Sequence, residues 1–351
     1  MQTSQSSLSV PNSDLASDKM KAIVQDEYGS PNVLTLKDID KPIPQDNEVL
    51  IRVYASSVNA SDWHLMRGKP FLIRLMFGGI TKPTIKTLGA DVAGCVEAIG
   101  KNVKRFQPGD EVFGDISECG FGAFADYVCA PEDTVMLKPN AVSFKEAAAV
   151  PAAAMAALQA LRDCGEIQTG QRVLINGASG GVGLFAVQLA KAFGAEVTGV
   201  CSTEKMEMVQ FPAGKASPTQ GADYVIDYTQ TDYTQAKQQY DLVLDAAAYC
   251  SVADVLPVLK LGGTYVMIGG STASFFQAML LGRWLTKRSG RHVKCLAMKP
   301  NQKDLATIRD LMVAGKITPH IDQCFNLSEV PAAIRYVEQR QVKGKVVIAV
   351  G

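Results

Sequence analysis

The stretch VLINGASGGVGLFAVQLAKAFGAEVTGVCSTEK, residues 173–205, decides the fold. An apolar run enters a cluster of small residues, and a helical pattern of apolar residues leaves it, so a buried strand turns through glycine into a helix. The strand AEVTGVC follows directly, and the same alternation of apolar runs and helical stretches continues to about residue 300. Such an alternation produces right-handed βαβ units. The sequence therefore predicts an α/β domain built on a doubly wound parallel sheet.

The glycine-rich turn has the spacing of a dinucleotide site. Gly180 and Gly181 allow the backbone to approach a pyrophosphate, and Gly183 allows the helix to pack closely on the strand. Backbone N–H groups at the start of a helix also bind phosphate charge. A glycine motif alone is weak support, but this one follows a strand and opens a helix. We therefore expect a nicotinamide dinucleotide to bind at Ser179, Gly180, Gly181, Val182 and Gly183.

The end of the second strand bears on the choice of cofactor. An NAD site usually places Asp or Glu about 20 residues after the turn, where it binds the ribose 2′-OH. Here the strand ends at Cys201, and Ser202, Thr203, Glu204 and Lys205 follow. Two hydroxyls and an ammonium can bind a 2′-phosphate, so we expect NADPH. Two alternatives stay open, namely Glu204 as the ribose ligand and Lys205 as a solvated helix residue.

The chain before residue 140 has a different character. The stretch NEVLIRVYASSV, residues 47–58, alternates polar and apolar residues, and further short strands are separated by Gly and Pro turns. This pattern predicts a compact β-rich unit. The last residues form a helix and a strand that could return to that unit. We expect four parts: an extension over 1–19, a catalytic domain over 20–141, a dinucleotide domain over 142–300, and a C-terminal return over 301–351.

Composition excludes several classes of protein. The 351 residues include 35 basic and 35 acidic ones, which gives no general attraction for nucleic acid. The eight cysteines contain no C-x-x-C pair, which argues against a zinc ribbon or a disulfide framework. Residues 1–19 are Ser-rich, without an apolar core or Arg, unlike a secretory or transit signal. The longest apolar stretch, 147–161, is too short to span a bilayer. We expect a cytoplasmic protein without an integral membrane segment.

Several motifs together resemble a known family. They include SVNASDWHLMRG (57–68), LGADVAGCVEAIGKNVKRFQPGDEVFG (88–114), NGASGGVG (176–183) and GKVVI (344–348). The chain is similar to the medium-chain dehydrogenase/reductases, specifically the zinc-free quinone oxidoreductase and enoyl reductase-like branch. The resemblance implies a GroES-like catalytic domain beside a Rossmann domain, an active site between them, and a homodimer. It also implies a small apolar quinone or α,β-unsaturated carbonyl as substrate.

The resemblance also bears on metal. Zinc members of the superfamily carry ligands at positions that here hold Asn59, Gly89-Ala90-Asp91 and the stretch PAAAMA, residues 151–156. Catalytic zinc needs three protein ligands, and only Asp91 is left. We therefore expect no metal, and hydrogen bonds that polarise the carbonyl while a hydride adds to the β-carbon. The rival functions are an alcohol or aldehyde dehydrogenase and an NADPH-binding protein without turnover.

The resemblance indicates candidate catalytic residues, and each of them has a structural role as the alternative. Asn59 could bind the substrate or the nicotinamide ribose, and Asp62 could line the cleft, but both could instead cap the helical turn that they begin. His64 lies near a position that is often Tyr in related reductases, and could donate a proton to the enolate. Its alternative is a surface or packing role. For Asp91 we expect a structural role.

On the cofactor side, Tyr228 matches a position near the adenosine phosphate, with an edge-strand aromatic as the alternative. Gly269 and Gly270 follow a strand and could pass the nicotinamide. Lys345 could approach the cofactor, but we favour the alternative of a solvated turn lysine. Two apolar segments, 71–79 and 274–285, could cover the substrate cleft, form the dimer contact, or pack in the core.

Overall fold

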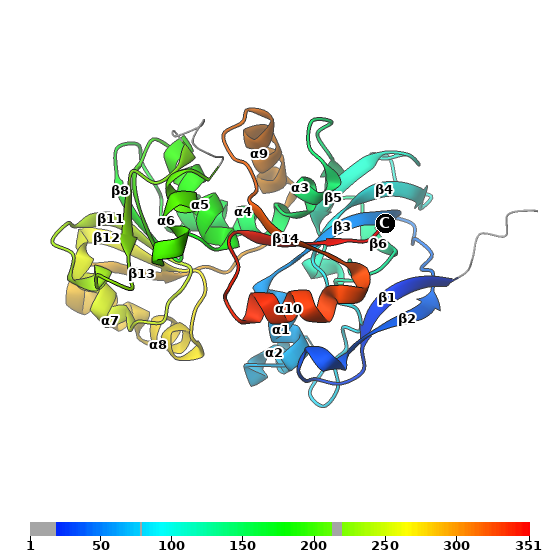
Figure 1. Cartoon of the computed structure of the whole chain (residues 1–351), viewed down its shortest axis with the longest axis horizontal. Helices are drawn as coiled ribbons and strands as arrows, with labels where there is room; N and C mark the ends of the chain where they lie inside the picture. Colours follow the sequence, from blue (N-terminus) through cyan, green and yellow to red (C-terminus); the bar gives the residue numbers. More distant parts are fainter. Residues whose placement is uncertain (1–18, 78, 213–219) are drawn as a thin grey trace, which may run out of the picture.

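The six-stranded sheet expected around residues 173–205 is present and entirely parallel (Figure 1). A computed structural model describes residues 19–77, 79–212 and 220–351. Of the extension expected over residues 1–19, residues 1–18 lie outside these ranges, whereas Lys19 already begins a strand. The strand order is β10-β9-β8-β11-β12-β13, the doubly wound order of dinucleotide-binding domains. The strands are β8 (Arg172–Asn176), β9 (Glu196–Cys201), β10 (Tyr224–Asp227), β11 (Tyr240–Asp245), β12 (Leu259–Met267) and β13 (His292–Cys295).

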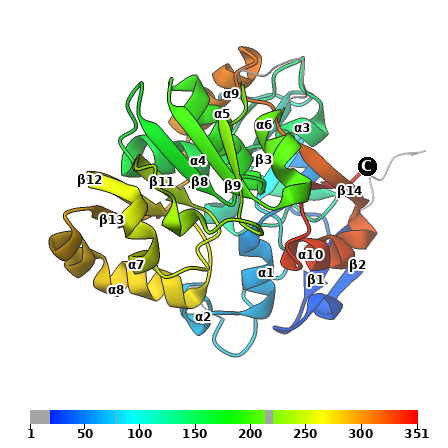
Figure 2. The ribbon, with the colours of Figure 1, turned by 60° about the vertical axis from the view of Figure 1, so that its left-hand side comes forward.

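Helices cover both faces of this sheet (Figures 1 and 2). On one face, Val173 and Ile175 of β8 pack in the same core as α4 and α5, while Leu174 packs in the core of the opposite face. This alternation along one strand is what a sheet buried on both sides requires. The helices are α4 (Pro151–Gln159), α5 (Gly181–Ala192), α6 (Met206–Gln210), α7 (Val252–Val255) and α8 (Thr272–Ser289).

The β-rich unit is built around β3, the strand predicted from the alternation over 47–58. Its sheet has the order β14-β15-β3-β4-β5-β7, and β6 also pairs with β3. The chain end returns here, because β15 lies between β14 and β3. The fold class is confirmed. The elements are β1 (Lys19–Gln25), β2 (Leu34–Asp40), β3 (Glu48–Val58), β4 (Asp91–Ile99), β5 (Glu111–Asp115), β6 (Tyr127–Pro131), β7 (Val135–Leu137), β14 (Ile321–Asn326), β15 (Lys345–Ala349), α1 (Ala60–Arg67), α2 (Phe71–Met76), α3 (Phe144–Ala148), α9 (Gln302–Val313) and α10 (Val330–Glu338).

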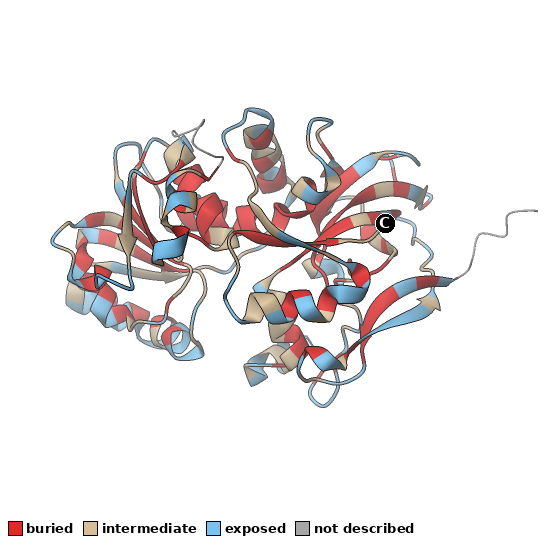
Figure 3. Ribbon diagram, in the orientation of Figure 1, coloured by how far each residue is buried: buried red, intermediate tan, exposed pale blue. Residues whose placement is uncertain are grey.

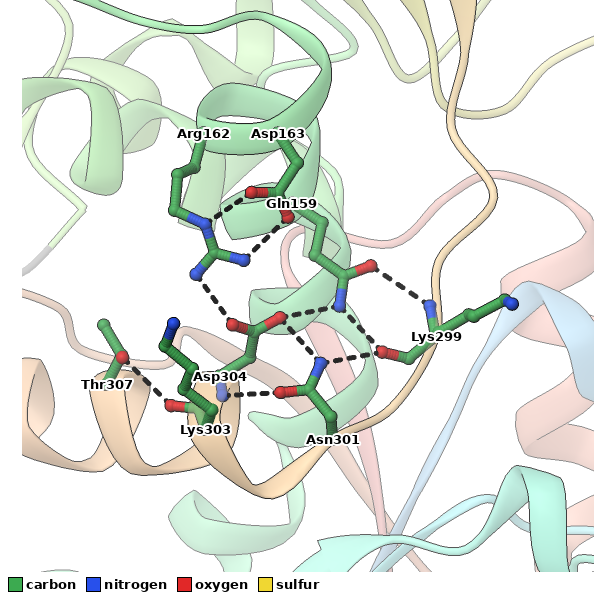
Figure 4. Close-up of polar contacts among 8 residues, drawn as sticks. All are labelled: Gln159, Arg162, Asp163, Lys299, Asn301, Lys303, Asp304 and Thr307. Atoms are coloured by element: carbon green, nitrogen blue, oxygen red, sulfur yellow. Dashed lines mark hydrogen bonds and ion pairs between the residues drawn. The ribbon is translucent and has the colours of Figure 1, made fainter.

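A polar cluster joins residues 299–304, where the chain returns toward the β-rich unit, to the end of helix α4 (Figure 4). Gln159 at the end of α4 donates to the Lys299 carbonyl at 2.7 Å and to the buried Asp304 carboxylate at 2.8 Å. Arg162 donates to the other Asp304 oxygen at 2.7 Å. Asn301 caps α9 by accepting from the Asp304 N–H. The segment between β13 and α9 is therefore held against α4, at the point where the chain leaves the Rossmann sheet and returns to the β-rich sheet.

The burial pattern decides the place of the two apolar segments (Figure 3). Nearly all of α4 is buried, whereas α2 contains no buried residue. In α8 the buried residues are Ser274, Ala278, Gly282 and Leu285, and most of the larger apolar side chains are exposed. Core packing, one of the three possibilities for 71–79 and 274–285, therefore holds for a minority of the described residues, such as Ile73, Ala278 and Leu285. Most of the large apolar side chains of both segments are exposed instead.

Candidate active site

The glycine-rich turn is built by steric limits that differ from residue to residue. A Cβ on Gly183 would lie 2.1 Å from the Gly177 carbonyl oxygen, a distance that no side chain tolerates. This confirms the packing reason given for Gly183. A Cβ on Gly180 would meet only the same oxygen, at 3.5 Å, so the space beside it is open. Gly180 is the N-cap of α5, and the first N–H groups of a helix have no partner within the helix, so they are available to a ligand. The turn therefore presents donors to an open surface, as a pyrophosphate site needs.

The expected cofactor residues gather at the carboxyl edge of the parallel sheet. Asn176 ends β8 directly beside Asp245, which ends β11. Strand order reverses at this point, and ligands of doubly wound sheets bind in the crevice there. The turn Ser179–Gly183 follows β8. The other expected residues follow neighbouring strands at the same edge: Ser202, Thr203 and Lys205 after β9, Tyr228 after β10, and Gly269 and Gly270 after β12.

A buried polar network lies behind this crevice, and the sequence analysis missed it. The Asn176 side chain donates to Asp245 at 2.8 Å and to the Tyr233 hydroxyl at 3.1 Å. The Tyr265 hydroxyl donates to the other Asp245 oxygen at 2.9 Å. Burial raises the pKa of Asp245 to about 6. Since Asp245 also accepts from the Ala247 N–H at 3.2 Å, the network fixes the loop that follows β11.

The end of β9 differs from the expectation in two respects. Lys205 is buried, and its Nζ donates to the carbonyls of Arg340 at 3.4 Å and Val342 at 3.1 Å. The alternative of a solvated Lys205 is therefore wrong, because the side chain ties the end of β9 to the C-terminal segment. A carboxylate also stands near this strand end, since the Thr203 hydroxyl donates to Asp227 at the end of β10. That hydrogen bond lowers the pKa of Asp227.

Tyr228 and the two glycines after β12 have different surroundings. The Tyr228 N–H donates to the Cys201 carbonyl at 3.1 Å, and the side chain is exposed. Gly270 has a φ of 152°, and a Cβ there would lie 2.5 Å from the Ala248 carbonyl oxygen. Gly269 accepts from the Ala248 N–H at 2.9 Å. The glycines thus allow the loops after β11 and β12 to run side by side.

Asn59 and Asp62 begin α1, but only Asp62 caps it with its side chain. The Asp62 carboxylate accepts from the Asn59 N–H at 2.7 Å and from the Gly89 N–H at 3.0 Å. The capping alternative is confirmed for Asp62. Burial raises its pKa to about 7. The Asn59 amide points elsewhere, donating to Asp91 at 2.8 Å and accepting from Lys345 at 2.6 Å.

Lys345 is the main residue that the sequence analysis misjudged. Its side chain is only 4% exposed, so the expectation of a solvated turn lysine is wrong. Nζ lies 3.4 Å from an Asp91 oxygen, and Asp91 is completely buried. The same oxygen accepts from Ser57 at 2.5 Å, and the other from the Ala152 N–H at the start of α4, at 2.8 Å. An ammonium therefore sits where Asn59, Asp91 and the 151–156 stretch converge, which are the positions compared with zinc ligands.

In the described part of the chain, no group of three or more His, Cys, Asp or Glu side chains has a metal-binding arrangement.

A second acid faces this lysine network. Asp115 on β5 lies opposite Asp91 in the register of the two strands, and it too is buried. One Asp115 oxygen accepts from the Ser117 N–H at 2.8 Å, and the other has no hydrogen-bond partner among the described residues. Burial, with the Asp91 charge adding to it, raises the pKa of Asp115 to about 7.

His64 lies further along α1, in a cleft of about 490 Å³ lined by Trp63, Phe71, Arg74 and Thr272 among others. Its Nδ1 is 2.7 Å from the Lys69 carbonyl oxygen. A carbonyl only accepts, so Nδ1 carries the proton and Nε2 of the neutral ring has none. Burial lowers the pKa of His64. His64 can therefore donate a proton from Nε2 only as an imidazolium.

The glycine-rich turn at the switch point of a doubly wound sheet is typical of a dinucleotide-binding protein, and comparisons with known proteins identify an oxidoreductase. A family model described as "Alcohol dehydrogenase GroES-like domain" matches residues 45–140, and one described as "Zinc-binding dehydrogenase" matches residues 220–348. The mouse (Mus musculus) protein NAD(P)H oxidoreductase RTN4IP1, mitochondrial, is 34% identical, over 94% of this chain and 89% of that protein. The 2-methylene-furan-3-one reductase of Solanum lycopersicum is 33% identical, over 97% of this chain and 80% of that protein.

A solved structure has the same architecture throughout. The quinone oxidoreductase from Coxiella burnetii superposes with a TM-score of 0.82 and is 31% identical, covering 95% of this chain and all of that one. The chain belongs to the medium-chain dehydrogenase/reductase superfamily, in its zinc-free quinone oxidoreductase-like branch. It is an oxidoreductase that uses a nicotinamide cofactor and a small-molecule substrate. Within the described ranges, none of the helices has both the length and the apolar character that a bilayer crossing requires.

Proposed function

We propose that the chain is a zinc-independent, NADPH-dependent reductase of quinones or α,β-unsaturated carbonyls. The observation that carries the proposal is the buried Lys345 ammonium beside the glycine-rich turn. A Cβ on Gly181 would lie 2.8 Å from the Lys345 Cδ, so the lysine passes directly under the start of α5. The resemblance to an enone reductase and a quinone oxidoreductase supports the substrate class.

The residues at the carboxyl edge fit a dinucleotide, since the space beside Gly180 is open and Gly180 is the N-cap of α5, where helical N–H groups lack partners within the helix. The turn Ser179–Gly183 would hold the pyrophosphate, and Gly269 and Gly270 would flank the nicotinamide. Ser202, Thr203 and Lys205 are proposed to bind the 2′-phosphate, and Tyr228 to lie near it. When bound, NADPH supplies a hydride from C4 of its nicotinamide.

The protein supplies position and charge. Asp91 and Lys345 fix both ends of the Asn59 amide, which is proposed to contact the substrate or the nicotinamide ribose. The Lys345 ammonium provides a fixed positive charge where negative charge grows on the carbonyl oxygen, which stabilises an enolate. His64 would deliver the proton as an imidazolium from the cleft. Asp62 holds the start of α1 and so positions both Asn59 and His64.

Turnover tests this proposal directly. Purified protein should oxidise NADPH with 1,4-benzoquinone, 9,10-phenanthrenequinone, an alkenal or a 2-enone, and treatment with a chelator should leave the rate unchanged. NADPH binding without turnover of any of the four compounds would favour the non-catalytic alternative. Stoichiometric zinc together with alcohol oxidation would favour the alcohol dehydrogenase alternative.

The choice of NADPH over NADH has its own test. The double variant Ser202→Ala/Lys205→Ala should weaken NADPH binding by about 1–3 kcal/mol, the range of charge-assisted hydrogen bonds, and leave NADH binding almost unchanged. Fluorescence titration measures both. Because Lys205 also holds two carbonyls of the C-terminal segment, Ser202→Ala alone serves as the control that leaves this tie intact. Equal losses for the two cofactors would remove the 2′-phosphate assignment.

Two further proposals concern assembly and location. We propose a homodimer, with the outer strand β13 of the Rossmann sheet as the edge available for pairing; size-exclusion chromatography with light scattering tests it. We also propose a cytoplasmic location, which the scattered cysteines without a C-x-x-C pair support. The mouse relative is named as a mitochondrial protein, so imaging of the tagged full chain against a mitochondrial marker decides between the two compartments.

A further inference from the structure

Helix α8 is oriented against the usual rule for a surface helix. The residues that face the sheet are small ones at a four-residue spacing, Ser274, Ala278 and Gly282, followed by Leu285. The larger apolar residues are exposed, with Leu280 at 70% and the others at lower values. They are Phe275, Phe276, Met279, Leu280, Leu281 and Trp284. An amphipathic helix normally buries such residues, and a contiguous exposed patch of them marks an interaction surface.

Helix α2 extends the same surface. Phe71, Leu72, Leu75 and Met76 are all exposed, with Met76 at 69%. The two helices lie along the lower side in both ribbon views, α8 below the Rossmann sheet and α2 below α1 and α10 of the other unit (Figures 1 and 2). Phe71 and Thr272, the first residues of α2 and α8, line the same cleft. We call the exposed residues of α2 and α8 the α2–α8 face.

The charge of this face is of one sign. The stretches 67–87 and 272–294 each contain five Lys or Arg and no Asp or Glu, in a chain whose net charge is zero. Some of these cations are paired from outside, such as Arg67 with Glu338 and Lys86 with Asp26. In contrast, Arg283 and Lys287 on α8 are exposed and form no ion pair with any acid in the described part of the chain. Arg288 lies over the Trp284 ring at 5.2 Å.

We propose that the α2–α8 face docks on the surface of an anionic lipid bilayer. Exposed apolar side chains that enter the boundary between headgroups and acyl chains, with Lys and Arg beside them on the phosphates, are the pattern of interfacial helices. Trp284 suits that boundary, where aromatic side chains gather. A second copy fits less well, because a two-fold contact through this face would set its cations against one another. Docking would turn the mouth of the His64 cleft toward the lipid.

Vesicle binding tests the docking, with the full chain and without turnover as a readout. The protein should co-sediment with phosphatidylcholine vesicles that contain phosphatidylglycerol, and much less with phosphatidylcholine alone. The variants Leu280→Gln/Trp284→Gln and Arg283→Gln/Lys287→Gln should each lower the vesicle partition coefficient at least about tenfold. All four side chains are exposed, so thermal unfolding should show an unchanged fold.

Matched controls test whether vesicle binding depends on where the substituted residues lie or only on the change in charge or apolar character. Lys104→Gln/Lys316→Gln makes the same change in charge at exposed positions elsewhere, and Ile43→Gln removes an apolar side chain that is 87% exposed between β2 and β3; both should bind as the parent does. The proposal is overturned if the parent chain ignores anionic vesicles, binds neutral ones equally well, or loses as much in the controls. A dimer in solution that Leu280→Gln/Trp284→Gln dissociates would show a subunit interface instead. Because catalysis is not measured, failure of the proposed reductase activity would not affect these outcomes.

Discussion

Replacing Lys345 by Met should expose the energetic role of the buried ammonium. Met is close to Lys in length and apolar, so it fills the space but removes the charge. The Asp91 carboxylate, completely buried, would lose its cation, and the Asn59 Oδ1 would lose a 2.6 Å hydrogen bond. Removing one partner of a buried ion pair costs about 3–5 kcal/mol, because the other charge stays desolvated. Most of that cost should therefore come from Asp91 rather than from lost packing.

This reasoning predicts a rescue. In Lys345→Met/Asp91→Asn the uncompensated charge is gone, while the single oxygen of an amide at position 91 can still accept from the Ala152 N–H and its NH2 group can donate to the Ser57 hydroxyl. The double variant should therefore be more stable than Lys345→Met by about 2 kcal/mol or more, a coupling within the range for residues in contact. Lys316→Met, at an exposed lysine, is the matched control and should cost no more than about 0.5 kcal/mol.

Urea unfolding followed by tryptophan fluorescence and circular dichroism measures these differences. Trp63 on α1 and Trp284 on α8 report on the catalytic and the Rossmann domain separately, so a loss confined to one domain becomes visible. The loss should appear first in the signal of Trp63, since β3, β4 and β15 carry the network. If Lys345→Met costs less than about 1 kcal/mol, or if Asp91→Asn worsens it, then Lys345 and Asp91 are not a coupled pair and the proposed role of the ammonium fails.

Three further predictions follow from the site. The pKa of Asp115 is raised to about 7, so its favourable contribution to the free energy of unfolding is complete below about pH 4 and is lost as pH rises through 7. Asp115→Asn should therefore stabilise the protein at pH 8 by about 1–3 kcal/mol and change little at pH 5. Thermal unfolding at both pH values measures this difference. If His64 donates as an imidazolium, kcat should fall as pH rises through a pKa that lies below the ordinary histidine value of 6.5, and His64→Gln should lose that dependence; identical pH profiles would remove His64 as the donor. In Gly183→Ala the new Cβ would lie 2.1 Å from a backbone oxygen, so this variant should shift α5 and weaken cofactor binding at least about tenfold. In Gly180→Ala the nearest atom would be 3.5 Å away, so the loss of cofactor affinity should be smaller. Equal losses of affinity in a titration would contradict the steric account.

The parallel sheet and the glycine-rich turn were predictable because their signals are local. Apolar runs, helical spacing and a turn of small residues lie within residues 173–205, and strands alternating with helices in this way form a parallel sheet. The capping role of Asp62 was predictable for the same reason, since its partner N–H is three residues away. Local patterns determine which element forms and how it begins.

The lysine network was not predictable, because its members meet only through tertiary structure. Asp91 and Lys345 are 254 residues apart, and they meet because β15 inserts beside β3. A lysine that opens an apolar strand was the only local hint. The orientation of α8 had a local signal that was overlooked, since Ser274, Ala278 and Gly282 mark a close-packing face. The burial of Lys205 had none, because its partners are carbonyls of a distant loop.

The glycine-rich turn and the lysine network form one mechanical unit. The Gly344 N–H donates to the Ser179 carbonyl at 2.9 Å, and Gly344 bridges to Gly180. Gly344 has a φ of 90°, and a Cβ there would lie 2.4 Å from the His320 carbonyl oxygen, so this position requires glycine. The next residue is Lys345. The backbone segment that bonds to the glycine-rich turn therefore also fixes the position of the Lys345 ammonium. A cofactor that orders the turn would also hold the ammonium in place, which is how a site can keep a fixed cation for an activated carbonyl without recruiting one from solution.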